Sequence, residues 1–396
     1  LQKEVIMIKK TIRVSDNNFR RYDDPLGNEK SKKYIFYART CDVPEGIPMA
    51  TNPRDQKLTS SVASTITESL LSNDGLFHLK NRGIILSAKR VRYDNRLQEV
   101  SIEFDDESCH GNIDGGHTYK ILLENKDKVL DQFVQFEVMT GVEPIIADLA
   151  EARNTSVAVD AKSMAELREK FDPIKESLEG MPFFERISFK QNQITRDTDT
   201  NKALKMIDAR DIVSIICMFN VEKYNSNEHP TKAYSGKQSM LNEYLEDPEH
   251  YRKFVNVIPD IFDLYEAIET EFAIAYNENG RMYGRKSYAG YKEGNPVGKS
   301  KFSQNDICYK VPDGLLYPTL ASFRCLLVFD RTSGKYRWMD GKDPITVWNK
   351  NKVGLTRSIM DLAGSLGDKP TVFGKDTSLW NYVYMVLATM EGISLV

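Results

Sequence analysis

The residues best suited to chemistry lie in one short segment, residues 111–120, which reads GNIDGGHTYK. Asp114 and His117 could serve as a general base or as metal ligands, because carboxylate and imidazole both bind divalent ions and imidazole titrates near neutral pH. The two glycines after Asp114 can adopt positive φ and let another molecule come close. Lys120 follows His117 by three residues, so the two share a face if the segment is helical. The segment indicates a ligand site, and acid–base chemistry is one use of it.

The pattern of this segment is typical of a strand end, a glycine turn and the first turn of a helix that continues through Ile121–Leu123. Asp114 is predicted to cap that helix, with its carboxylate against the free N–H groups of the first turn. If Asp114 does not cap the helix, the same N–H groups would form an anion or phosphate site.

Two further chemistries are open to the residues around this turn. His110, Asp114 and His117 could converge on a divalent ion. The interpretation that we favour is simpler: a capping aspartate and two polar turn histidines, with no metal site. Ser108 and Cys109 are candidate nucleophiles, but a cysteine beside a histidine in sequence is weak evidence, because catalytic pairs are assembled in space. Cys109 is expected to be a small, partly buried residue at a strand end.

The overall composition is that of an ordinary globular protein. At 396 residues, with 41% hydrophobic and 28% charged residues, the chain is expected to form two domains. A formal net charge of −3 gives no global attraction to nucleic acid, so any such contact must come from a local patch. Five scattered cysteines without a Cys-x-x-Cys pair favour the reducing cytoplasm. No apolar run is long enough to span a bilayer, so no membrane partner is expected.

The N-terminal part, residues 1–160, mixes strand and helix patterns and is predicted to form a mixed α/β domain around the glycine turn. Residues 8–36 are polar and are interpreted as an arm or a loosely attached strand. Residues 59–71 have helical apolar spacing, whereas residues 84–104 alternate as a hairpin does. The acidic loop 105–107 is expected to be solvated.

The C-terminal part, residues 161–396, is predicted to be mainly helical, which makes the whole chain α+β. A long helix is expected from about Tyr251 to Tyr276, kinked or split at Pro259. The loop 280–302 interleaves three tyrosines with the cations Arg281, Arg285, Lys286, Lys292, Lys299 and Lys301, of which the first five are the expected nucleic-acid contacts. Charge with exposed aromatic rings is how a loop contacts phosphates and stacks bases. The alternative, which we rate slightly higher, is a mobile, solvated linker.

Several short motifs resemble those of the AIPR family, which is named for abortive phage infection. The resemblance would extend from Asn52 to Arg324. It is carried by Asn81-Arg82-Gly83-Ile84, by residues 112–118, by Ala152-Arg153-Asn154-Thr155, and by the later segments Tyr234-Ser235-Gly236-Lys237 and Tyr317-Pro318-Thr319-Leu320.

The centre of the motif departs from the usual family pattern. Asp114 replaces an asparagine, and His117 replaces a glutamine. These changes also make the motif similar to the Asp-Gly-Gln-His-Arg motif of DndB-like proteins and of the ParB/sulfiredoxin fold, where it lies at a strand-to-helix junction beside nucleotide or phosphate. Thr118 stands where the arginine of that motif would be, so a phosphate-binding arginine cannot be carried over.

The resemblance implies a bacterial or phage-related protein of antiviral defence. The first hypothesis is a module that binds nucleic acid or nucleotide through the turn, helped by the basic loop. Its expected ligand-binding residues are Asn81, Arg82, Gly83, Asn112, Asp114, Gly115, Gly116, His117, Thr118, Lys120 and Asn154.

Two other hypotheses remain open. One is a metal-dependent nuclease or nucleotide hydrolase, with Asp114 and His117 as the candidate catalytic residues. The other is a scaffold that senses a phage protein and triggers a co-encoded effector. The sequence specifies neither a cofactor nor an oligomeric state.

Overall fold

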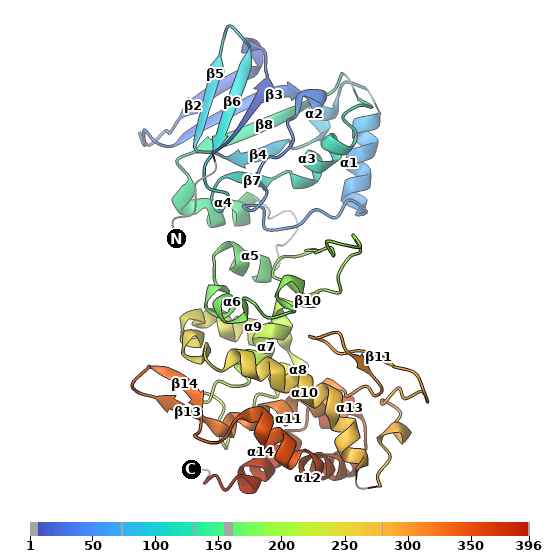
Figure 1. The fold of residues 1–396 in the computed structure, drawn as a ribbon. Coiled ribbons are helices and arrows are strands. Elements are labelled where there is room, and N and C mark those ends of the chain that lie inside the picture. The colour runs from blue at the N-terminus through green and yellow to red at the C-terminus, as the bar shows by residue number, and fades with distance from the viewer. Residues whose placement is uncertain (1–6, 73, 130, 154–160, 279, 395–396) are drawn as a thin grey trace. The chain divides into compact units, whose positions relative to one another are not determined.

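The structure, a computed structural model, describes residues 7–72, 74–129, 131–153, 161–278 and 280–394. Contacts divide the chain into two compact units (Figure 1). Unit 1 comprises Leu1–Glu169 with Phe189–Gln193, and unit 2 comprises Lys170–Ser188 with Ile194–Val396. Sheets and helices mix in unit 1, whereas long helices dominate unit 2. The predicted α+β class, with a mixed N-terminal part and a helical C-terminal part, is confirmed.

The main sheet of unit 1 has five strands in the order β2-β3-β8-β4-β7. They are β2 (Phe19–Asp23), β3 (Lys32–Arg39), β4 (Ile84–Ser87), β7 (Gly111–Asp114) and β8 (Phe133–Thr140). Strands β4 and β8 run parallel, whereas the other neighbours in this sheet are antiparallel. A second sheet has the order β1-β6-β5, formed by β1 (Ile8–Arg13), β5 (Arg90–Asp94) and β6 (Glu99–Phe104).

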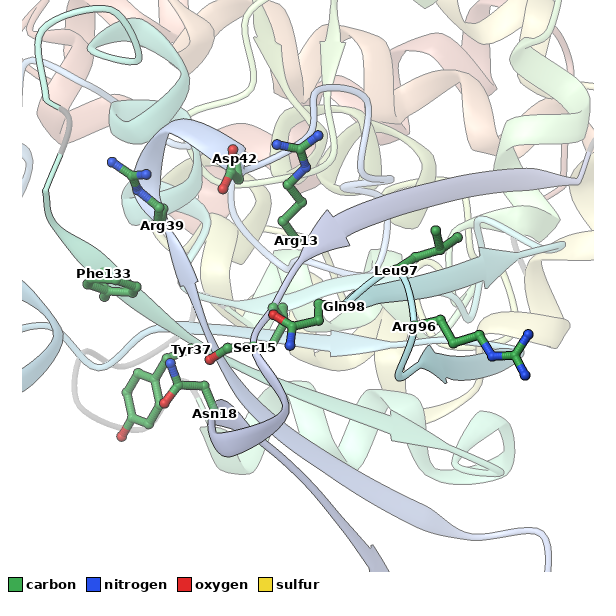
Figure 2. A pocket seen from close by; sticks show the side chains of 11 residues that line it. Arg13, Ser15, Asn18, Tyr37, Arg39, Asp42, Arg96, Leu97, Gln98 and Phe133 are labelled. Carbon is green, nitrogen blue, oxygen red and sulfur yellow. The ribbon is translucent and has the colours of Figure 1, made fainter.

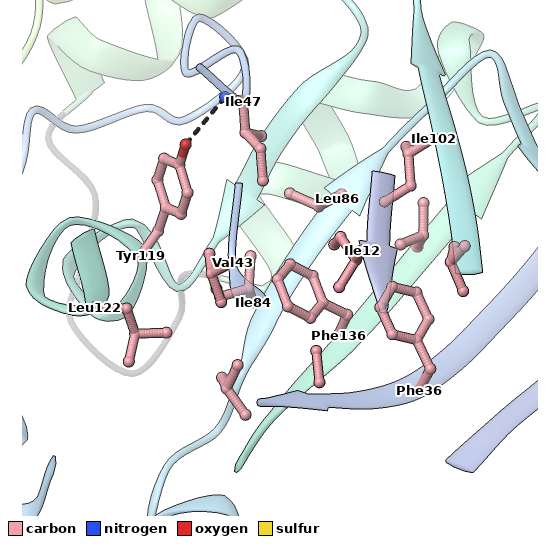
Figure 3. Close-up of a cluster of buried hydrophobic side chains, with 14 of the residues drawn as sticks. Ile12, Phe36, Val43, Ile47, Ile84, Leu86, Ile102, Tyr119, Leu122 and Phe136 are labelled. Carbon is pink, nitrogen blue, oxygen red and sulfur yellow. Dashed lines mark hydrogen bonds between the residues drawn. The ribbon is translucent and has the colours of Figure 1, made fainter. Parts of the chain in front are cut away.

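Unit 1 has two buried clusters, and Figure 3 shows residues of the larger one. Alternate residues of β3 and β8 are buried there, and the rings of Phe36 and Phe136 stack at 5.1 Å. Ile12 of β1 and Ile102 of β6 join the same cluster. The expectation of an arm over residues 8–36 is therefore wrong. The many charged residues obscured a strand pattern in which charges face outward and Ile12 faces inward.

The α-helices in the described residues of unit 1 are α1 (Ser61–Leu71), α2 (Phe77–Lys80), α3 (Gly116–Glu124), α4 (Ile146–Arg153) and α5 (Ala161–Leu167). Ser60 caps α1 by accepting a hydrogen bond from Ala63 N at 3.2 Å. Tyr119 anchors α3, because its hydroxyl accepts from Ile47 N at 3.0 Å (Figure 3) and donates to Pro44 O at 2.9 Å. These contacts fix the helix that follows the glycine turn.

Unit 2 is built on helices that pack in pairs. They include α7 (Ala209–Cys217), α9 (Lys237–Glu246), α10 (Ile258–Asn277), α11 (Asp313–Ser322), α12 (Pro344–Ser365) and α14 (Thr377–Met390). Helix α10 packs against α12, and α11 packs against α14. The predicted long helix is split: a 3₁₀ segment, Pro248–Phe254, precedes α10, and Pro259 lies in the first turn of α10, where its missing N–H is not needed. None of the helices in the described residues has both the length and the apolar character of a membrane span.

Candidate functional site

The glycine turn joins β7 to α3 at the edge of the main sheet. Strand β7 ends at Asp114 and α3 begins at Gly116, with Gly115 between them. Strand β7 is antiparallel to β4, and Asp114 pairs with Ile85. The segment Asn81–Gly83, directly before β4, therefore lies beside the turn. These two segments therefore lie at the ends of neighbouring strands.

Two glycines let three backbone segments meet at this edge. Gly83 and Gly115 have φ values of +86° and +80°, in the left-handed region that favours glycine. A β-carbon on Gly115 would lie 2.3 Å from the carbonyl oxygen of Gly83. A β-carbon on Gly83 would lie 2.4 Å from the carbonyl oxygen of Gln135 in β8. Both glycines are thus required by the backbone arrangement itself.

Asn81 and Thr118 tie the segment before β4 to the first turn of α3. The Oδ1 atom of Asn81 accepts from Gly83 N at 2.7 Å, and its amide nitrogen donates to Thr118 Oγ1 at 3.0 Å. Thr118 is buried. The polar groups of these two predicted ligand residues are engaged inside the protein, where they position the turn.

Asn112 is fully buried and links the turn to the loop that contains Asn52. Its Oδ1 atom accepts from Asn52 Nδ2 at 2.7 Å, and its Nδ2 atom donates to the carbonyl oxygen of Asp114 at 3.1 Å. Asn52 Oδ1 in turn accepts from Arg54 N at 3.0 Å. Asn112 is therefore a positioning residue, and its partner Asn52 holds the backbone of Arg54 in place beside the turn.

Arg54 is a residue of this site that the sequence did not reveal. Burial lowers the pKa of its guanidinium, and the negative charge of Asp114 acts in the opposite direction. In the sequence, residues 52–55 indicate only a break between elements. The available signal was an asparagine two residues before an arginine, a spacing at which an asparagine side chain often bonds to backbone. Arg54 brings a guanidinium to the turn from outside the motif.

The predicted N-cap role of Asp114 is wrong. The N-cap is Gly115, and among the described residues no side chain caps α3. Asp114 Oδ1 accepts from Gly115 N at 2.7 Å instead, because the left-handed glycine adds one residue between the carboxylate and the helix. Burial raises the pKa of Asp114, while this N–H group and the charges of Arg82, Arg54 and Arg153 oppose that effect.

His117 is the partly buried polar residue of the first helical turn. Burial lowers its pKa, a hydrogen bond to the backbone of Lys57 opposes this, and the charges of Arg54 and Lys120 lower it further. His117 is consequently neutral at pH 7. One ring nitrogen bonds to the backbone, and the other is left as an acceptor. The turn therefore places the neutral imidazole of His117 among several cations, at a helix start that no side chain of the described residues caps.

The other histidine considered for a metal site, His110, is directed elsewhere. It is 2% exposed, with Nδ1 2.7 Å from Asp105 Oδ1 and Nε2 3.1 Å from Glu143 Oε1. Asp105 therefore faces a buried partner, whereas Asp106 and Glu107 are exposed, as expected for loop 105–107. Within the described residues, no group of three or more His, Cys, Asp or Glu side chains is arranged to hold a metal ion. Burial and nearby acids raise the pKa of Cys109 to about 11, so its thiol is protonated at neutral pH.

Asn154, the last predicted ligand residue, lies outside the described residues. Its neighbour Arg153 ends α4 and donates to Glu137 Oε1 at 2.8 Å. Glu137 also pairs with Lys33 at 3.1 Å.

The basic loop 280–302 belongs to unit 2 and is held there by acids. The interpretation as a solvated linker is wrong, because Tyr283 is fully buried and the hydroxyl of Tyr288 donates to Asp368 at 3.0 Å. Three of its five predicted nucleic-acid contacts form ion pairs, Arg281 with Asp361, Lys286 with Asp368 and Lys299 with Asp306. Arg285 and Lys292 are exposed and have no ion pair within the part of the chain that the structure describes.

A cavity of about 660 Å³ in unit 1 gathers arginines that are far apart in sequence (Figure 2). Its lining includes Arg13, Arg39 and Arg96, with the rings of Tyr37 and Phe133. Arg39 pairs with the exposed Asp131 at 3.2 Å, whereas Arg13 and Arg96 have no ion pair among the described residues. We call this site the arginine pocket. No sequence motif marks it, because sheet formation alone brings residues 13, 39 and 96 together.

Comparison with known proteins identifies the family. A family model described as AIPR protein matches residues 49–368, which is most of the chain, so the chain belongs to the AIPR family. The match includes the glycine turn and Arg54, whereas β1, β2 and β3 precede it. No curated protein and no solved structure matches the chain.

Proposed function

We propose that this AIPR protein acts in antiphage defence by binding nucleic acid through the glycine turn of unit 1. Membership of the AIPR family fits an abortive-infection role. The observation that carries the binding proposal is the start of α3, which no side chain among the described residues caps and which lies beside Arg54 and Arg82.

A helix start of this kind favours an anion for two reasons. The N–H groups of the first turn lack intrahelical acceptors, and the helix dipole concentrates positive potential there. Phosphate oxygens can accept hydrogen bonds from these N–H groups, and their negative charge is favoured by this potential. The side chain of Gln56 covers Gly116, since a β-carbon at Gly116 would lie 2.6 Å from Gln56 Nε2. This cover is a flexible side chain, so in the proposal it moves aside when phosphate approaches.

The residues of the turn then divide into two groups. Asn81, Asn112 and Thr118 hold the backbone in place through the hydrogen bonds described above. Arg82 and Lys120 supply charge, and His117 supplies a neutral acceptor for a base or sugar hydroxyl. Because the formal net charge is −3, binding depends on this local arrangement.

The arginine pocket favours a polymer over a single nucleotide as the ligand of unit 1. It combines the guanidinium groups of Arg13 and Arg96 with the rings of Tyr37 and Phe133, the pairing of charge and aromatic surface that single-stranded nucleic acids use. Arg39 and Phe133 are direct partners on neighbouring strands β3 and β8, so charge and ring stand side by side.

The test is a binding titration of labelled single-stranded and double-stranded oligonucleotides at several salt concentrations. Arg82 is exposed, and the substitution Arg82→Glu reverses its charge. The control is Arg92→Glu, because Arg92 is an exposed residue of β5 that lies in neither the turn nor the arginine pocket. Affinity should fall steeply with salt. Arg82→Glu should lower it roughly tenfold or more, and Arg92→Glu should leave it nearly unchanged. Absence of binding at every salt concentration, or equal effects of the two variants, would overturn the proposal.

A catalytic role at the same turn is the second candidate, and the neutral His117 beside a partly buried Asp114 is the observation that favours it. Purified protein would be incubated with labelled DNA, RNA and each nucleoside triphosphate, with and without divalent metal ions. Product that forms with wild type and is lost in His117→Ala supports catalysis. If no product forms and His117→Ala still abolishes phage protection, the role of the turn is binding.

A further inference from the structure

A second cluster of charged side chains lies wholly within unit 2, around Asp211 of α7. Its two carboxylate oxygens accept from two ammonium groups, Lys237 Nζ at 2.6 Å and Lys301 Nζ at 2.7 Å. Burial opposes ionisation of Asp211, but the two lysines outweigh it and lower its pKa. Asp211 thus fixes a lysine of α9 and a lysine of the basic loop against each other.

Two adjoining cavities open beside this cluster, with volumes of about 320 and 490 Å³. They share four lining residues, which are Lys205, Glu269, Lys299 and Asp313. Lys301 lines the smaller cavity and Tyr288 the larger. Pockets of a few hundred cubic ångströms are the size that small organic ligands occupy.

Two of the lining lysines, Lys205 and Lys301, have backbone carbonyl groups that are held by Arg186. Arg186 donates to the carbonyl oxygens of Lys205 at 3.0 Å, Lys301 at 2.9 Å and Phe302 at 2.7 Å. These bonds fix the chain at both lysines. Lys205 itself is exposed and has no side-chain partner within the described residues. Lys299 pairs only with exposed groups, Asp306 and the carbonyl oxygen of Gln304, so an anion can replace them at little cost.

Glu269 and Asp313, which line both cavities, supply acceptors. Glu269 Oε2 accepts from Lys301 N at 2.8 Å, and burial raises the pKa of Glu269 to about 7. This carboxyl group can therefore either donate or accept at neutral pH.

We infer that these cavities bind a nucleotide, with its phosphate on Lys205, Lys299 and Lys301, and with its sugar hydroxyls or base amine on Glu269 and Asp313. Tyr288 offers a ring face for the base. Among the described lining residues, cations outnumber carboxylates, so an anionic ligand fits better than a cationic one. The basic loop of the sequence analysis thereby becomes the wall of a small-molecule site. This site is formed by residues of unit 2, whereas the turn belongs to unit 1.

The test is isothermal titration calorimetry of the full chain with ATP, AMP and pyrophosphate. ATP should bind, and Lys205→Glu should weaken its binding roughly tenfold or more. The matched control is Lys292→Glu, an exposed lysine of the basic loop that lines neither cavity. It should leave the affinity nearly unchanged. Glu269→Gln should weaken AMP and ATP but not pyrophosphate, which carries no sugar hydroxyl or amine. A cooperative melting transition and a circular dichroism spectrum like that of wild type would verify that each variant folds.

Three results would overturn the inference. One is the absence of heat with all three probes at millimolar concentration. Another is an equal loss of ATP affinity in Lys205→Glu and Lys292→Glu. The last is ATP binding that survives Lys205→Glu but is abolished by Arg82→Glu in unit 1, which would assign the nucleotide to the turn. If only oligonucleotide binding is absent, the proposed function of the turn in unit 1 is contradicted, and the inference about the cavities of unit 2 is not.

Discussion

The carbonyl oxygen of Gly83 lies so close to the α-carbon of Gly115 that a β-carbon there would come within 2.3 Å of it. The segment before β4 and the turn after β7 thus meet backbone to backbone. This contact explains why glycine recurs in both motifs: it keeps the start of α3 at the sheet edge, beside Arg54 and Arg82.

Gly115→Ala should be strongly destabilising, because the substitution adds a clash with Gly83 to the strain of a left-handed alanine. Gly27→Ala is the matched control, since Gly27 has φ +81° and a β-carbon added to it would have nothing within 4 Å. We expect a loss of about 1 kcal/mol in the control and at least about 2–3 kcal/mol in Gly115→Ala. Urea unfolding followed by circular dichroism measures both. Equal losses would mean that the close approach to Gly83 is not a constraint.

Glu269→Gln should change how stability depends on pH. The pKa of Glu269 is raised in the folded chain to about 7, from an ordinary value of 4.5. The folded chain therefore holds this proton more tightly, and the associated stability is lost as pH rises from about 4.5 through 7. Relative to wild type, Glu269→Gln should gain up to about 3 kcal/mol between pH 5 and pH 8.

The control for that measurement is Glu278→Gln, at the exposed end of α10. It should show no such gain when urea unfolding is compared at the two pH values. A Glu269→Gln variant that follows wild type at both values would show that this carboxyl group is not shielded from water.

Arg324→Ala should destabilise unit 2, because Arg324 is a fully buried charge held by many partners. Its guanidinium donates to the carbonyl oxygens of Tyr224, Asn225 and Ala321, contacts His229 Nδ1 at 2.7 Å, and lies 4.1 Å from the centre of the Tyr384 ring. Its removal leaves buried acceptors unsatisfied and a cavity, a loss of about 3–5 kcal/mol.

Arg337→Ala provides the comparison for Arg324, since the interactions of Arg337 are exposed: an ion pair with Asp340 and a hydrogen bond to the carbonyl oxygen of Trp338 at 3.0 Å. That variant should cost less than about 0.5 kcal/mol in thermal or urea unfolding. A similar small loss in Arg324→Ala would contradict the structural role assigned to the buried guanidinium.

Local sequence patterns predicted the strand, turn and helix of the site, but contacts between residues far apart in the sequence could not be predicted. The strand–turn–helix around Gly115 was predicted from its glycines and its apolar spacing, whereas its contact with Asn81–Gly83 depends on the pairing of β4 with β7. The cap at Asp114 was wrong because the left-handed conformation of Gly115 shifted the helix start by one residue. Arg54 reaches the turn through a bond between Asn52 and Asn112, sixty residues apart, which no local pattern encodes.

The arginine pocket and the two cavities of unit 2 could not be predicted from local sequence patterns for the same reason. The arginine pocket depends on the pairing of β3 with β8, and the site of unit 2 joins Lys205, Glu269 and Lys299 from separate elements. In the basic loop the charges were visible in the sequence, but their partners Asp361, Asp368 and Asp306 were not. The charge pattern alone therefore suggested a more open surface than the one that forms.

The central claim is that phosphate lies against the first N–H groups of α3, and hydrogen–deuterium exchange tests it most directly. Exchange would be followed by mass spectrometry with and without a single-stranded oligonucleotide at low salt. We predict slower exchange in the peptide that covers Gly115–Tyr119, an effect that is reduced in Arg82→Glu and retained in Arg92→Glu. Unchanged exchange in that peptide, with protection confined to other segments while the oligonucleotide is bound, would contradict the account.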